Sequence, residues 1–221
     1  DYAPGYADDG SIDDASLAEA QRLAAAADVA LVFAGLPDTY ESEGFDRTNL
    51  DLPAGHNRLI ETVASAQRHT AVVLMNGSAI VLPWADKVPA IVEAWLGGQA
   101  AGGAIADVLT GRVNPSGKLS ETFPIRLEDT PAYLSFPGLD GEAHYGEGIF
   151  IGYRYYDSKK VAPLFAFGHG LSYTTFAYSD LTAAAKSFDD VAGTSVSVTV
   201  KNTGSRAGQE VVQLYMHERA P

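Results

Sequence analysis

Apolar residues in the first half of the chain gather in short runs that alternate with helical patterns. The runs at 28–36, 70–75 and 90–96 are almost continuous in Val, Leu, Ile and Ala, which is typical of strands buried on both faces. A further apolar segment at 79–82 precedes a proline. This alternation predicts an α/β fold, with a mainly parallel sheet sandwiched by helices and joined by right-handed crossovers.

Three helices are expected between these strands. Residues 13–27 are rich in alanine, and Ser16 with Glu19 fits a capping box. A second helix is expected to begin at Pro53, because proline suits a first helical turn. The third, over 100–111, is rich in Ala and Gly and ends at a glycine. The second helix has one apolar face, formed by Leu59, Ile60, Val63 and Ala64.

The pattern changes after residue 124. Residues 125–175 are rich in Gly, Pro, Tyr and Phe and show no helical period, so we predict a long connecting arm there. Apolar residues then alternate with polar ones at 196–200 and again at 212–216, with a turn signal at 202–204. This predicts half-buried antiparallel strands. We therefore expect an α/β domain at 1–124, an arm at 125–175 and a partial β-sandwich at 176–221.

Composition narrows the function. The formal net charge of −13 argues against a nucleic-acid partner and against anionic membrane surfaces. No apolar run approaches the roughly 20 residues that a membrane helix needs. The chain has no cysteine and its histidines are widely spaced, so we predict no metal site. The compartment is left undetermined.

Two glycine-rich stretches resemble nucleotide-binding motifs without matching them. The segment at 97–103 lacks the spacing of a dinucleotide fingerprint, and the segment at 111–119 has five residues between its glycines and a leucine where a P-loop has Ser or Thr. We therefore predict no cofactor.

The strongest chemical signal is the loop directly after the first predicted strand, with the sequence YESEGFDR at 40–47. Open α/β sheets place ligand chemistry at the carboxyl ends of their strands. Glu41 and Glu43 are two positions apart, so in an extended segment they point to opposite sides and one site would use only one of them. That carboxyl group could serve as a general acid if burial raised its pKa. The second carboxylate of a glycosidase pair would have to come from elsewhere.

Several segments in this order resemble the C-terminal part of glycoside hydrolase family 3 β-glucosidases. They are ESEGFDR at 41–47, LDLP at 50–53, NPSGKL at 114–119 with TFP at 122–124, EGIFIGYRYY at 147–156 and FGHGLSY at 167–173. The tail, with VTVKNTG at 198–204 and VVQLY at 211–215, is similar to the family's fibronectin III-like domain. Residues 2–6 resemble the stretch that follows an inserted PA14 domain in some members.

The resemblance implies a retaining exo-β-glucosidase acting on terminal β-D-glucosyl residues. It implies Glu43, which directly precedes the glycine of the loop, as the acid/base, with Glu41 as the second candidate. Phe45, Asp46 and Arg47 are expected to bind substrate or shape the loop. The aspartate nucleophile would lie in an N-terminal TIM barrel that this sequence lacks, so we expect a fragment that is inactive alone.

Two alternatives stay open. One is a non-catalytic carbohydrate-binding or assembly module in which the 40–47 loop is structural. The other is an exo-glycosidase of different sugar specificity, such as a β-xylosidase, because the absent barrel would hold most of the sugar-binding residues.

Overall fold

The computed structural model describes residues 1–185, 187–189 and 191–216, which form two compact units. The first unit contains Asp1–Gly102 and Ser120–Phe167, and the second contains Gly103–Leu119 with the described residues from Gly168 onward. The units are discontinuous in sequence, and the three-part domain division drawn from the sequence stays a prediction. No helix in the described ranges has both the length and the apolar character that a membrane span requires.

The first unit is built on three parallel strands in the order β1-β2-β3: Ala30–Gly35, Thr70–Met75 and Ala90–Glu93. Val32 lies opposite Val72, which lies opposite Ile91 in the next strand. This confirms the predicted parallel sheet. The third strand is shorter than the apolar run at 90–96 suggested, because the chain turns at Trp95, whose φ is +51°.

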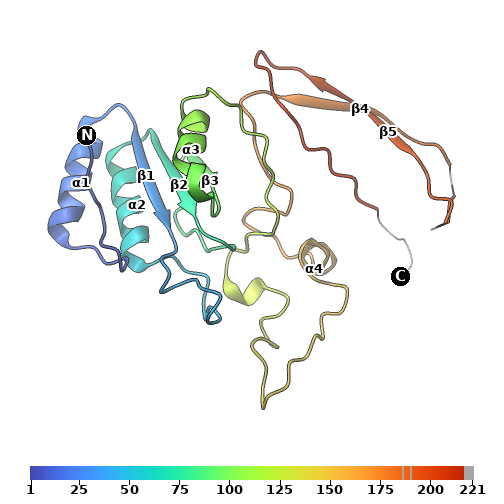
Figure 1. Ribbon diagram of the computed structural model, residues 1–221, viewed down its shortest axis with the longest axis horizontal. Helices are drawn as coiled ribbons and strands as arrows, with labels where there is room; N and C mark the ends of the chain where they lie inside the picture. Colours follow the sequence, from blue (N-terminus) through green and yellow to red (C-terminus); the bar gives the residue numbers. More distant parts are fainter. Residues whose placement is uncertain (186, 190, 217–221) are drawn as a thin grey trace. The chain divides into compact units, whose positions relative to one another are not determined.

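Helix α2 (Ala54–Ala66) packs on β1 and β2, and α1 (Asp14–Ala26) packs against α2 (Figure 1). Leu59, Ile60 and Val63 of α2 are buried, as the apolar face predicted. The predicted capping box of α1 is wrong, since the helix begins earlier. Its N-cap is Asp13, whose carboxylate accepts a hydrogen bond from the Ser16 N–H at 2.7 Å.

The prediction that all strands are buried on both faces is wrong for β1. Val32 and Ala34 are buried, whereas Leu31 and Phe33, on the opposite face, are 48% and 41% exposed. A continuous apolar run indicates that both faces of a strand are apolar, but it does not identify the element that covers each face.

The segment at 125–175 is not free of helix. It contains a 3₁₀ turn, η2 (Leu127–Asp129), and a seven-residue helix, α4 (Tyr153–Lys159). Gly152 and Lys160, with φ of +51° and +56°, flank α4, and Tyr156 is its buried residue. Two turns are too short to produce an apolar stripe in the sequence.

The second unit contains most of α3 (Ala101–Leu109, preceded by the 3₁₀ turn η1, Gly98–Ala100) and an antiparallel pair, β4 (Phe176–Ala183) and β5 (Val196–Asn202). Asn114 accepts hydrogen bonds from the Ser172 hydroxyl and the Tyr173 N–H. Lys118 and Glu210 form a largely buried ion pair at 3.2 Å.

Two predictions for this tail are wrong. Residues 211–216 alternate in polarity but form no strand, and β4 and β5 are mostly exposed rather than half-buried. Alternation marks the two faces of a strand without supplying a partner for its backbone. Residues 217–221, also assigned to this tail, lie outside the described residues.

Candidate functional site

The segments that follow the three parallel strands meet at one edge of the sheet. The Leu36 N–H donates to the Met75 carbonyl at 3.1 Å, and the Ala94 N–H donates to the Leu74 carbonyl at 2.9 Å. The first bond places the start of the loop after β1 beside the end of β2. The second places the start of the segment after β3 beside the end of β2 as well. This is the carboxyl edge at which the sequence predicted ligand chemistry.

The loop after β1 contains a tight turn with Glu43 and Gly44 at its centre. Ser42 and Phe45 form an isolated antiparallel bridge across it, and the Gly44 N–H donates to the Ser42 hydroxyl at 3.1 Å. Glu43 therefore lies at the tip of the turn, and its side chain is exposed.

Both ends of this turn are fastened to the segment after β2. The Glu41 carboxylate accepts hydrogen bonds from the Gly77 N–H at 2.6 Å and the Ser78 hydroxyl at 2.9 Å. Arg47 donates to the same Ser78 hydroxyl at 2.7 Å and to the Ala79 carbonyl at 3.3 Å. Glu41 and Arg47 thus hold the ends of the loop, and Ser78 joins them.

Arg47 stays charged although it is partly buried. Burial lowers the pKa of Arg47, while the carboxylates of Glu41, Glu121 and Asp51 act in the opposite direction. An arginine side chain stays protonated under any such balance at neutral pH. Its Nη2 is buried and has no hydrogen-bond partner among the described residues.

The other predicted loop residues take no part in the hydrogen bonds among Glu41, Arg47 and Ser78. Phe45 is 49% exposed, and Asp46 is exposed as well. Within the described residues, neither Glu43 nor Asp46 has a side-chain hydrogen bond or an ion pair, whereas Glu41 uses both of its carboxylate oxygens.

Gly44 has no internal reason to be glycine. Its φ is not in the left-handed region, and a Cβ added there would meet only the Ser42 Oγ, at an ordinary 3.5 Å. A glycine without such a need leaves room for another group to approach the backbone closely.

One more carboxylate, Glu93, which the sequence analysis did not single out, lies at the end of β3. Its Oε1 accepts a hydrogen bond from the Trp95 N–H at 2.9 Å, and its Oε2 accepts one from the Asn76 side-chain amide at 3.3 Å. Burial raises the pKa of Glu93 to about 7, and the neighbouring carboxylates of Glu121 and Glu41 act in the same direction. The two hydrogen bonds oppose this rise without cancelling it.

Glu121 supplies a further carboxylate and lines an open cleft of about 460 Å³. Burial raises its pKa, against the lowering effect of the Ala79 backbone and of Arg47. The other lining residues are Gly77, Trp95, Leu96 and Ser120. The indole ring of Trp95 packs against Phe123, with 5.9 Å between ring centroids. The edge of the sheet therefore combines an exposed carboxylate on a fixed turn with a cleft containing an aromatic residue and a partly buried acid.

Sequence reasoning missed Glu93, Glu121, Trp95 and Asn76. The one available signal was Glu93, a single carboxylate inside the apolar run AIVEAWL. A charged residue within a strand expected to be buried needs a partner, which marks Glu93 as a candidate site residue.

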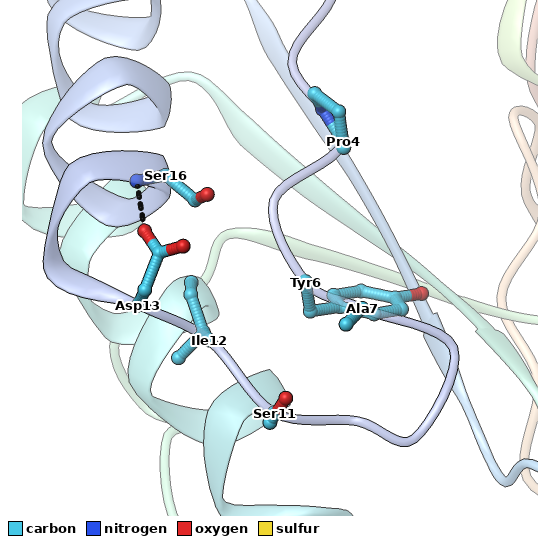
Figure 2. Close-up of a pocket in the computed structure, with 7 residues that line it drawn as sticks. All are labelled: Pro4, Tyr6, Ala7, Ser11, Ile12, Asp13 and Ser16. Carbon is cyan, nitrogen blue, oxygen red and sulfur yellow. Dashed lines mark hydrogen bonds between the residues drawn. The ribbon is translucent and has the colours of Figure 1, made fainter.

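A separate pocket, of about 280 Å³, lies near the N-terminus and offers little chemistry. Figure 2 shows that its one carboxylate, Asp13, points to the Ser16 N–H as the cap of α1. Among the residues that the structure describes, no group of three His, Asp or Glu side chains is placed to hold a metal ion.

Comparison with known proteins identifies close relatives of this arrangement. Residues 6–173 match the glycosyl hydrolase family 3 C-terminal domain. The chain is 56% identical over 218 residues to thermostable beta-glucosidase B of Acetivibrio thermocellus. The match covers 98% of this chain and 29% of that protein. It is 50% identical over 205 residues to probable beta-glucosidase I of Aspergillus terreus, covering 90% of this chain and 24% of that protein.

Solved structures agree with the sequence matches. The Bifidobacterium adolescentis GH3 beta-glucosidase superposes with a TM-score of 0.86 at 46% identity, covering 91% of this chain and 30% of that one. The Kluyveromyces marxianus beta-glucosidase in complex with glucose superposes with a TM-score of 0.79 at 42% identity, and the match covers 89% of this chain and 23% of that one. The chain spans less than a third of the length of each of these four relatives.

Proposed function

Because this chain belongs to glycoside hydrolase family 3, we propose that it is the part of a retaining exo-β-glucosidase that supplies the general acid/base. The substrate class would be terminal, non-reducing β-D-glucosides, which is supported by relatives that are all named as beta-glucosidases. The whole activity would belong to a longer polypeptide, of which this chain is one portion.

One observation carries the assignment of Glu43 rather than Glu41. Glu41 is committed to the Gly77 N–H and the Ser78 hydroxyl, so its carboxylate shapes the loop. Glu43 lies at the tip of the turn, exposed and without an internal partner in the described part of the chain. A proton donor must reach the leaving oxygen of a substrate, and of these two carboxylates Glu43 is the one free to do so.

In the proposed mechanism, Glu43 protonates the glycosidic oxygen as the bond to the aglycone breaks. It then removes a proton from the water that hydrolyses the glycosyl-enzyme. Acid catalysis near neutral pH needs a carboxyl group of raised pKa, and burial is one cause of such a rise. Glu43 is exposed in this chain, so the remainder of the protein would have to cover it.

The nucleophile would be an aspartate in an N-terminal TIM barrel of the same protein. Its carboxylate would lie about 5–5.5 Å from that of Glu43, the spacing of retaining enzymes. Phe45 and Asp46, exposed beside Glu43, would then face the substrate or the barrel, and Arg47 would hold the loop.

Two finer features complete the proposal. The antiparallel pair β4 and β5 would begin a fibronectin III-like domain, supported by the resemblance at 198–204. Residues 2–6 would follow an inserted PA14 domain, an assignment that depends on their resemblance alone.

The test uses Glu43→Ala in the full-length polypeptide. Turnover of a poorly activated alkyl glucoside should fall by about 10²–10⁴-fold, the usual contribution of general acid–base catalysis. Added azide should restore turnover of an activated aryl glucoside, because azide can attack the glycosyl-enzyme without a general base.

The matched control is Glu41→Ala, which should impair the enzyme without azide rescue. Rescue of Glu41→Ala but not of Glu43→Ala would exchange the two roles. Full activity in both variants would instead favour a non-catalytic carbohydrate-binding or assembly module. Faster hydrolysis of aryl xylosides than of aryl glucosides by the unmodified enzyme would identify an exo-glycosidase of different sugar specificity.

A further inference from the structure

We infer that Glu93 is a positioning residue for the turn that carries Glu43, acting through Asn76 and Ser78. The inference rests on the proposed function, because Glu43 is its endpoint. Among the described residues Glu93 has no hydrogen bond to the turn itself, and Asn76 and Ser78 connect the two through hydrogen bonds.

The first link joins Glu93 to the segment after β2. Its Oε2 accepts from the Asn76 side-chain amide at 3.3 Å, and the same amide donates to the Ser78 carbonyl at 2.9 Å. Asn76 is fully buried. It therefore joins the carboxylate at the end of β3 to the backbone at position 78.

The second link joins Ser78 to both ends of the turn. Its hydroxyl lies 2.9 Å from the Glu41 carboxylate and 2.7 Å from the Arg47 guanidinium. Whatever moves the backbone at Ser78 therefore moves both ends of the loop. A displacement of about 1 Å can cost about 10²-fold in rate when the displaced group is catalytic.

The third link joins Glu93 to the cleft. Its Oε1 accepts from the N–H of Trp95, a residue whose φ of +51° is unusual for an aromatic side chain. This hydrogen bond holds the backbone in that conformation, and Trp95 lines the cleft beside Gly77. Glu93 therefore fixes the wall of the cleft and the base of the loop together.

The charged groups around Glu93 make this position sensitive to its protonation. Glu41, from the loop after β1, and Glu121, beside the cleft, both disfavour the ionised form, and burial raises the pKa of Glu93 to about 7. Arg47 faces Glu41, Glu121 and Asp51. The Asn76 carbonyl oxygen is buried without a hydrogen-bond partner among the described residues.

The test compares two substrates in the full-length polypeptide with Glu93→Gln. A misplaced acid harms departure of a poor leaving group more than that of a good one. We expect kcat/KM for an alkyl glucoside to fall at least about tenfold more than kcat/KM for a dinitrophenyl glucoside. Glu61→Gln is the control, because Glu61 pairs with Lys87 on the exposed side of α2 and should leave this ratio unchanged.

A second readout does not depend on catalysis. The protein is labelled with 5-fluorotryptophan, and the Trp95 resonance is assigned by its loss in Trp95→Phe. In the unmodified protein that resonance should shift with a midpoint near pH 7, and Glu93→Gln should abolish the shift. Ser78→Ala should keep the shift and still show the substrate preference, which serves as the second variant if Glu93→Gln does not fold.

The outcomes separate the two proposals. Azide rescue of Glu43→Ala combined with equal losses on both substrates in Glu93→Gln overturns the positioning role alone. A Trp95 shift that persists in Glu93→Gln also overturns it. Failure of azide rescue in Glu43→Ala rejects the proposed function, whatever the fluorine spectra show.

Discussion

Glu41 and Arg47, on either side of the Ser42–Phe45 turn, bind the same hydroxyl group of Ser78, at 2.9 and 2.7 Å. An acid and a base six residues apart thereby close a loop without touching each other directly. The serine hydroxyl donates to one and accepts from the other, so it satisfies both at once.

Ser78→Ala should weaken the first unit measurably. Glu41 loses one donor, and Arg47, half-buried, loses one acceptor, so we expect a loss of about 1–3 kcal/mol in the free energy of unfolding. Urea denaturation would measure it. Ser65→Ala is the control: its hydroxyl bonds the Glu61 carbonyl on the exposed face of α2, and its removal should change stability by less than about 0.5 kcal/mol. Equal effects at both positions would show that the shared hydroxyl contributes little.

Glu93 should make the fold less stable as pH rises. Its folded pKa of about 7 lies above the reference value of 4.5, so the unfolded chain releases this proton first. Its contribution is therefore fully present below pH 4.5 and is lost as pH rises to about 7, by up to about 3 kcal/mol. Melting curves of Glu93→Gln between pH 4 and 8 should lack this component, whereas an unchanged pH dependence would contradict the assignment.

His56 should have the opposite effect. It is 3% exposed, its ring lies 3.7 Å from that of Tyr6, and neither nitrogen has a hydrogen-bond partner among the described residues. Burial lowers the pKa of His56, against a smaller opposing effect of the Gly35 backbone. The neutral ring is therefore favoured in the fold, and stability is lost as pH falls below 6.5 toward the lower folded value.

Replacing His56 by leucine should reduce that acid sensitivity in the same melting curves, although it removes the ring contact. The exposed His69, replaced by glutamine, is the matched control for the loss of an imidazole ring. Glu93 and His56 act in opposite directions between pH 4.5 and 6.5, so each is resolved only by subtracting its own variant.

Two glycines should respond to alanine with opposite signs. A Cβ on Gly103, inside α3, would meet nothing within 4 Å, so Gly103→Ala should stabilise that helix by about 0.5–1 kcal/mol. A Cβ on Gly77 would lie 3.0 Å from the Glu41 carboxylate and should displace it, at a cost of about 1 kcal/mol. Denaturation midpoints would measure both, and stabilisation by Gly77→Ala would show that Glu41 is not held there.

The sequence predicted the parallel sheet well because its signals are local and repeated. The run before Gly35 and the apolar face of α2 each involve several residues that report the same buried surface. The loop at 40–47 was placed correctly at a strand end for the same reason, since only the limits of β1 were needed.

What could not be predicted depends on contacts between distant positions. Nothing near Glu41 in sequence says that it bonds residues 77 and 78, and nothing near Glu93 identifies Asn76 as its partner. The failure at 211–216 has a related cause, because a strand exists only where a second strand lies beside it. In its place, the Gln213 amide donates to the Gly168 carbonyl at 3.1 Å.

The doubly fastened turn has a thermodynamic consequence. A flexible loop of this length would lose conformational entropy when ligand arrived, at about 1–2 kcal/mol for each residue ordered. Here the hydrogen bonds at positions 41 and 47 impose that loss when the chain folds. Ligand binding would then meet a carboxylate whose backbone is already ordered, and the energy of association would remain available for the substrate.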